Sequence, residues 1–130
     1  MANPNIVSVS SIYGGNASWN LSATLSTVLL TVSAEVIVKV NSILCANVDG
    51  TNAATLNLYI DGVGTTVTGV TGTGLATTIY LAKTVSVPAD DILVVIDKPI
   101  YLMEGDILKG GASAASDLDL FISYEVINDA

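Results

Sequence analysis

The chain has 130 residues, no histidine, no arginine and a net charge of −8, which comes from twelve acidic residues and four lysines. It therefore lacks the side chains that most often shuttle protons or clamp phosphate and carboxylate groups, and the common catalytic arrangements are not open to it. The acidic balance also argues against binding to nucleic acid or to an anionic membrane, because no Lys/Arg cluster can release counterions from phosphates. We expect a non-enzymatic structural or binding protein that needs no cofactor.

A length of 130 residues, 51% of them hydrophobic, suits one domain with a single core over residues 1–130. Only 12% of the residues are charged, against roughly 25% in typical soluble domains, so the surface suits packing against other protein. The lone cysteine, Cys45, lies in an apolar run and is expected to be a buried, inert thiol. The N-terminus lacks the features of a signal peptide, and no apolar run is long enough for a membrane span, which predicts synthesis and retention in a cytoplasm.

Period-two alternation of Val, Ile, Leu, Thr and Tyr, broken by Gly, Asn, Asp and Pro, predicts many short strands. Residues 1–22 are expected to form a first strand and then a surface excursion over residues 10–22, which contains two adjacent glycines and several Asn and Ser residues. Strands are predicted at residues 27–32 and 35–41, as a pair joined near Ser33-Ala34. After Asn41-Ser42 the phase of the alternation becomes ambiguous over residues 43–46, which indicates a bulge or a fully buried continuation.

The clearest strand pattern runs from Thr55 to Asp61, where alternate leucine and isoleucine side chains point to one face. A turn is predicted before it at Asp49-Gly50, with the glycine in a positive-φ conformation. Residues 61–75 contain five glycines interleaved with Thr and Val. We interpret this segment as a flexible loop or, alternatively, as an extended hairpin or arm that adds to a neighbour's sheet. Further strands are predicted at residues 77–87, 92–96, 100–103 and 118–127.

The pattern as a whole predicts an all-β protein with little or no helix, because no window shows the three-and-four spacing of an amphipathic helix together with helix caps. Many short strands with frequent turns favour an antiparallel two-sheet β-sandwich, with a jelly-roll-like topology as one arrangement. A closed barrel is the alternative.

No motif in the chain specifies chemistry. The glycine spacing of residues 64–71 resembles a phosphate-binding loop but lacks its lysine. Acid pairs at 90/91, 104/106 and 117/119 are interpreted as solvated turn residues, with calcium binding and then glycosidase chemistry as weaker alternatives. Trp19 and the tyrosines are expected to pack in the core or in interfaces rather than to form a sugar-stacking platform. No metal site is therefore predicted.

Three segments carry a resemblance to a known group of proteins: ILCANVDGTNAA at 43–54, AKTVSVPAD at 82–90 and PIYLMEGD at 99–106. Together with the closing strand at 117–127, they resemble small structural proteins of tailed-bacteriophage virions, particularly those of marine and cyanobacterial phages. The resemblance implies a capsid decoration (cement) protein on the virion exterior or, alternatively, a neck, tail or baseplate component. It further implies the major capsid protein or other virion proteins as partners, and a homo-oligomer, with a trimer favoured.

Contacts in such an assembly are expected in the N-terminal stretch and in the Gly/Thr-rich segment. The candidate contact residues are Asn3, Ile6, Tyr13, Trp19, Gly62, Val67, Val70 and Gly74. A carbohydrate-binding module for host attachment is the alternative from a different class of function. It would use Trp19 and Tyr13, beside carboxylates, as its platform.

Overall fold

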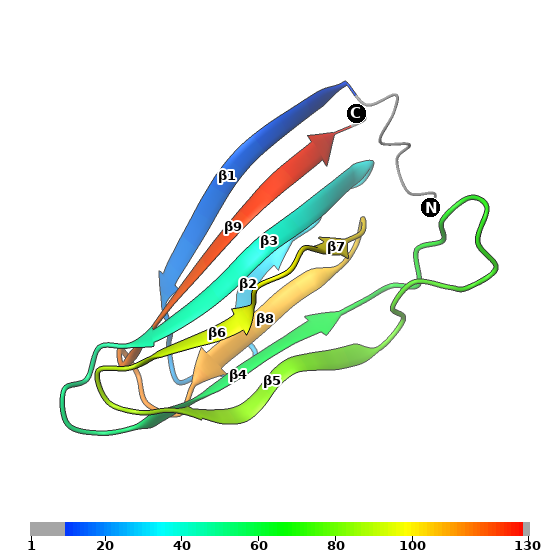
Figure 1. Ribbon diagram of the computed structural model, residues 1–130. Helices are drawn as coiled ribbons and strands as arrows, with labels where there is room; N and C mark the ends of the chain where they lie inside the picture. The colour runs from blue at the N-terminus through cyan, green and yellow to red at the C-terminus, as the bar shows by residue number, and fades with distance from the viewer. Residues whose placement is uncertain (1–9, 129–130) are drawn as a thin grey trace.

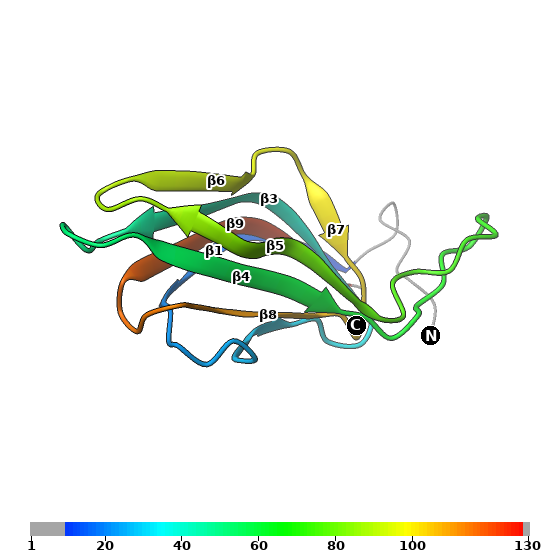
Figure 2. The ribbon, with the colours of Figure 1, turned by 90° about the horizontal axis from the view of Figure 1, so that it is seen from below.

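A computed structural model describes residues 10–128, and this range folds into two antiparallel β-sheets packed face to face (Figures 1 and 2). It contains strands and no helix, so the predicted all-β two-sheet sandwich is confirmed. Asn3 and Ile6 lie outside the described residues. The strands are β1 (Ser11–Asn20), β2 (Val28–Thr31), β3 (Val36–Asn47), β4 (Ala54–Asp61), β5 (Thr78–Val87), β6 (Ile92–Ile96), β7 (Ile100–Leu102), β8 (Ile107–Ala112) and β9 (Leu118–Asn128).

The strand order is that of a jelly roll. Sheet I has the order β1-β9-β3-β6, with the short strand β7 also paired to β3, and sheet II has the order β2-β8-β4-β5. Eight of these strands form the two facing four-stranded layers of the jelly roll, and β7 is an addition to sheet I. Neighbouring strands are mostly distant in sequence, so the fold is held together by long-range pairings.

The predicted pairing of the strands on either side of Ser33-Ala34 is wrong. β2 pairs with β8 in sheet II, whereas β3 pairs with β9 in sheet I, and the connection between β2 and β3 crosses from one sheet to the other. Val32 and Val36 are buried on the two sides of this crossing, and Glu35 adopts a positive φ of 59° within it. Crossing allows both strands to turn their apolar faces toward the same core.

Two strands were not anticipated from the sequence, and both contain adjacent glycines. Residues 10–22 were expected to be a surface excursion, but β1 pairs with β9 along its whole length without a break in register. There Gly15 lies beside the ring of Tyr124, and an added Cβ would be in van der Waals contact with this ring. In β8, a Cβ at Gly110 would overlap the backbone carbonyl of Asn57, so this glycine allows a close approach of β8 to β4.

The core is aliphatic, and the alternation predicted for residues 55–61 is confirmed, since Leu56, Leu58 and Ile60 are buried. A register shift between Val40 and Ser42 in the pairing of β3 with β9 confirms the predicted bulge. Beyond this bulge the positions of β3 that belong to the core cluster change from even to odd numbers, although Ile37, outside that cluster, is also buried. The residues buried in β3 after the bulge are Ile43, Cys45 and Asn47.

Cys45 is fully buried, as predicted. Burial, with a smaller contribution from the negative charge of Asp119, raises the pKa of the Cys45 thiol to about 11.

The turn after β3 is also present as predicted, held by the Asn47 Oδ1, which accepts from the Asp49 N–H at 2.9 Å. The expected positive φ at Gly50 is wrong: in this region the left-handed conformation falls on Asp90, with φ 56°.

Candidate assembly surfaces

The segment between β4 and β5 is a hairpin arm, residues 62–77, that projects beyond the end of the sandwich (Figures 1 and 2). Its two sides are joined by the Gly64 N–H, which donates to the Leu75 carbonyl at 2.8 Å, and by the Gly74 N–H, which donates to the Thr65 carbonyl at 3.0 Å. A tight turn at the tip places Gly69 at φ +91°. Of the two interpretations of this segment, the hairpin is the one observed.

The arm presents apolar side chains and no charge. Val70 at the tip is 63% exposed, Val67 is 37% exposed, and Val63 near the base is also exposed. Residues 62–77 contain no Asp, Glu, Lys or Arg. Exposed apolar side chains on an uncharged projection are typical of an interaction element, because nothing within the arm itself covers them.

Two of the predicted contact residues, Gly62 and Gly74, have a different role. A Cβ at Gly62 would overlap the Leu75 carbonyl, and a Cβ at Gly74 would overlap both Met103 and the Thr65 carbonyl. These glycines allow the two sides of the arm to approach each other and the sandwich. They belong to the internal packing of the arm rather than to its exposed surface.

The base of the arm is fastened to the turn between β7 and β8. Thr65 is buried, and its Oγ1 donates to the Glu104 carbonyl at 2.7 Å. The Glu104 carboxylate in turn accepts a 2.7 Å hydrogen bond from the Glu35 N–H in the connection between β2 and β3. Arm, turn and connection therefore form one junction, which holds the arm in a defined direction.

The prediction that Glu104 and Asp106 are solvated turn residues is wrong, because the junction covers them. Their exposed fractions are 2% and 4%. The Asp106 Oδ2 accepts from the Met103 N–H at 2.9 Å, whereas its buried Oδ1 has no hydrogen-bond partner. Burial raises the pKa of the Asp106 carboxyl above its usual value, and the Met103 hydrogen bond only partly opposes this shift.

Tyr13 and Trp19 both lie on β1, at odd-numbered positions that point to the same side of sheet I. Tyr13 is 62% exposed, whereas Trp19 is half-buried and packs against the core. Six residues of extended strand separate them by about 20 Å, so the two rings do not form one stacking platform for a sugar. Tyr13 therefore remains a surface contact candidate, and Trp19 is a core residue at the edge of the sheet.

The outer face of sheet I carries an apolar row that sequence reasoning missed. The strand register places Phe121 of β9 opposite Leu44 of β3, and Leu44 opposite Val94 of β6. Phe121, Val94 and the nearby Ile92 are exposed, and Leu44 is half-buried. In the sequence, each of these strands has an apolar residue on the otherwise polar side of its alternating pattern. These residues form a continuous row only when the strands are placed side by side.

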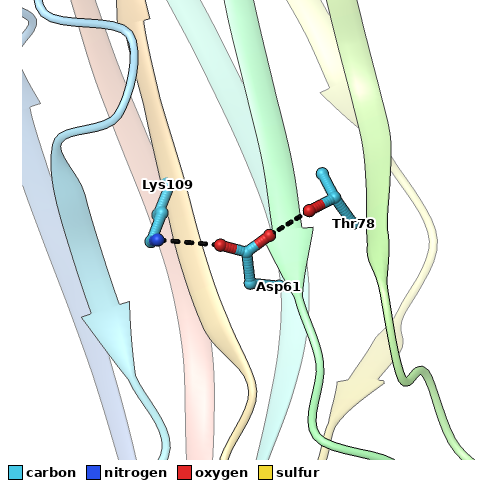
Figure 3. Close-up of polar contacts among 3 residues, drawn as sticks. All are labelled: Asp61, Thr78 and Lys109. Atoms are coloured by element: carbon cyan, nitrogen blue, oxygen red, sulfur yellow. Dashed lines mark hydrogen bonds and ion pairs between the residues drawn. The ribbon is translucent and has the colours of Figure 1, made fainter.

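The outer face of sheet II carries a polar cluster beside the adjacent rings of Tyr59 and Tyr80. The Lys109 Nζ lies 2.7 Å from the Asp61 Oδ2, and the Thr78 hydroxyl donates to the other oxygen of the same carboxylate (Figure 3). The hydrogen bond from Lys109 and then that from Thr78 lower the pKa of Asp61, and the Asp61 carboxylate raises the pKa of Lys109. These three groups are therefore paired with one another.

A groove of about 320 Å³ opens between β2 and the inner face of sheet I. Its lining includes Leu30, Val38, Tyr124 and Val126, and no charged side chain contributes to it.

Within residues 10–128 no three Asp, Glu, Cys or His side chains converge on a point where a metal ion could sit. The same range contains no helix long and apolar enough to cross a membrane.

Comparison with known proteins found no matching protein-family model and no matching curated protein. A solved structure from work titled "Bacillus endospore appendages form a novel family of disulfide-linked pili" is similar to this chain, with 13% sequence identity and a TM-score of 0.42. The similarity covers 92% of this chain and 88% of that chain.

Proposed function

We propose that this chain is a non-enzymatic structural protein of a tailed-phage virion and that it decorates the outside of the capsid as a cement protein. The resemblance of residues 43–54, 82–90 and 99–106 to phage virion proteins supports this role. The observation that carries the proposal is the arm, residues 62–77, because it is fastened to a stable sandwich yet exposes uncharged apolar side chains. Such an element fits a seam or groove on a neighbouring protein.

The proposed partner is the major capsid protein in its assembled form. A subunit that binds the finished lattice, and not the free capsid subunits, stabilises that lattice by mass action. This role requires a self-supporting fold and a low-charge contact surface, and it requires no catalytic group. The chain would be made in the host cytoplasm and added to the exterior of the head.

The first test is the copy number of this chain in purified particles, measured by quantitative mass spectrometry against the major capsid protein. Decoration predicts about one copy per capsid subunit if a trimer sits on each local threefold axis, or about one per three subunits if a single copy does. A total of about six or twelve copies per particle would instead assign the chain to the neck or tail. Absence from particles would contradict both virion roles and favour a separate binding module.

The second test removes an apolar contact at the tip of the arm. Val70→Ser should weaken binding to undecorated heads about tenfold, because it deletes roughly one buried aliphatic side chain from the contact. Val48→Ser is the matched control, since Val48 is also exposed but follows β3 at the opposite end of the sandwich (Figure 1). Equal affinities for the two variants would contradict an arm-mediated attachment.

A further inference from the structure

The strand β1 forms a free edge of sheet I. Within residues 10–128 it pairs with β9 on one side and with no strand on the other. The register pairs Asn20 with Asp119, so the next pair is Leu21 with Leu118. The Leu21 N–H donates to the Leu118 carbonyl at 2.8 Å, so Leu21–Leu118 is a hydrogen-bonded pair. Because such pairs alternate along an antiparallel ladder, the odd-numbered residues of β1 bond to β9. The even-numbered residues, from Ile12 to Asn20, direct their N–H and C=O groups outward.

This edge lacks the features that usually protect a sheet from pairing with another chain. Residues Ser11–Asn20 contain no charged residue and no proline, and their register with β9 has no bulge. The opposite edge of sheet I is interrupted between β6 and β7 by Asp97-Lys98-Pro99. An edge of ten residues with free backbone groups is a template for a further strand.

The two edges of sheet II are protected in other ways. β2 has four residues and a register shift in its pairing with β8. β5 has register shifts in its pairing with β4, and Thr84 within it adopts a positive φ of 52°. Among the edges of the described fold, β1 is therefore the one that is long, regular and uncharged, and its counterpart in a second copy is the matching partner.

We propose that β1 pairs antiparallel with β1 of a second copy of this chain, about a two-fold axis through Asn16. Residues opposite one another in an antiparallel pair point to the same side of the sheet, so odd positions must face odd positions. Placing Asn16 opposite its own copy meets this condition and sets Tyr13 opposite Trp19 twice. The alternative centre at Gly15 would set Tyr13 opposite Ala17 and would lose both aromatic pairs.

The proposed pairing joins the two sheets into one continuous layer through about ten backbone hydrogen bonds. Two copies that each carry a charge of −8 repel each other, so the location of the acidic residues matters. The acids nearest this edge are Asp119 and Glu125 on β9, one strand behind it, and Asn20 donates to the Asp119 Oδ1 at 2.7 Å. Across the pair these carboxylates lie about three strand spacings apart, about 14 Å, which exceeds the screening length of about 8 Å in physiological salt.

The first experiment is analytical ultracentrifugation of the full chain from about 1 μM to about 1 mM, which covers the affinities expected for a small interface. The wild type should dimerise with rising concentration. Asn16→Lys places two ammonium groups opposite each other on the axis and should abolish the dimer. Ser123→Lys is the matched control, because Ser123 is the β9 partner of Asn16 on the same face, and it should dimerise like the wild type.

A cross-linking experiment tests the register independently of any loss of folding. Asn16→Cys should form an intermolecular disulfide under mild oxidation, because a hydrogen-bonded pair has a Cα separation of about 5.5 Å. Gly14→Cys should not cross-link to its own copy, since four residues of strand, about 14 Å, would separate the two sulfur-bearing positions. The native Cys45 is buried and does not compete.

The pairing is independent of the proposed virion role, and its failure is distinguishable from the failure of that role. A wild type that stays monomeric throughout, or that forms a trimer, would overturn it. Cross-linking of the Gly14→Cys variant as readily as the Asn16→Cys variant would overturn the register. Dimerisation of Asn16→Lys equal to that of Ser123→Lys would show that β1 is not the contact.

Discussion

Replacing Asp106 by asparagine tests whether a buried charge at the base of the arm limits the stability of this protein. The carboxylate is 4% exposed, and one of its oxygens has no hydrogen-bond partner. A buried polar atom without a partner costs about 1–3 kcal/mol, and more when it is charged. Asparagine retains an acceptor for the Met103 N–H and cannot ionise. We expect Asp106→Asn to be more stable than the wild type by about 1 kcal/mol at neutral pH.

The sign of the pH dependence follows from the direction of the pKa shift. Burial raises the folded-state pKa of Asp106 above its usual value of 3.8, so between these two pKa values the folded state holds the proton more tightly than the unfolded state. The contribution of Asp106 to the free energy of unfolding is therefore greatest below 3.8. It falls as the pH rises through this window, and the loss persists at higher pH.

Urea unfolding of the wild type and the variant, at several values from about pH 3 to about pH 8, measures this difference. The advantage of Asp106→Asn should grow as the pH rises from the acid end and then level off. Asp97→Asn is the control for a change in total charge, because Asp97 is exposed between β6 and β7. A constant difference between Asp106→Asn and the wild type across the whole pH range would refute the argument.

Three further predictions concern the sandwich. Gly110→Ala should destabilise the fold by about 1–3 kcal/mol in urea, since its Cβ would meet the facing strand, whereas Gly14→Ala, whose Cβ meets no atom within 4 Å, should change the stability far less. Cys45 should resist iodoacetamide at about pH 8 in the folded protein and react after unfolding, and fast labelling of the native state would contradict its burial. Asp61→Asn should lower the stability slightly at neutral pH, less so in high salt, and the difference from wild type should vanish at acid pH, because the lowered pKa of Asp61 makes its contribution disappear as the pH falls through the folded-state value. A thermal melt series in pH and salt measures this last effect, and a larger difference at acid pH would contradict it.

Several elements could be predicted from local pattern alone. The strand at 92–96 was predicted with the bounds that β6 has, and the apolar side of β4 was assigned correctly. The loss of phase after Asn41-Ser42 lies next to a register shift in β3. Each of these features depends on a short window of sequence. The alternation of side chains across a strand is a property of its own backbone, so it can be read before the neighbours of the strand are known.

The glycine-containing strands could not be found in this way. Gly15 of β1 lies beside the ring of Tyr124 of β9, and Gly110 fits in β8 because the backbone of β4 approaches closely there. In a local window the same glycines indicate turns. Their value as strand residues comes from partners that lie far away in the chain.

Some features of the candidate assembly surfaces could likewise be predicted from the sequence, and others could not. The sequence showed that residues 61–75 are rich in glycine and threonine and that the protein has a low proportion of charged residues, and both properties are visible in the composition. The burial of Glu104 and Asp106, the row formed by Phe121, Leu44 and Val94, and the free edge of β1 emerged only with the strand order. The faces of a strand follow from its two-residue repeat, whereas its neighbours follow from the competition of all strands for a place around one core.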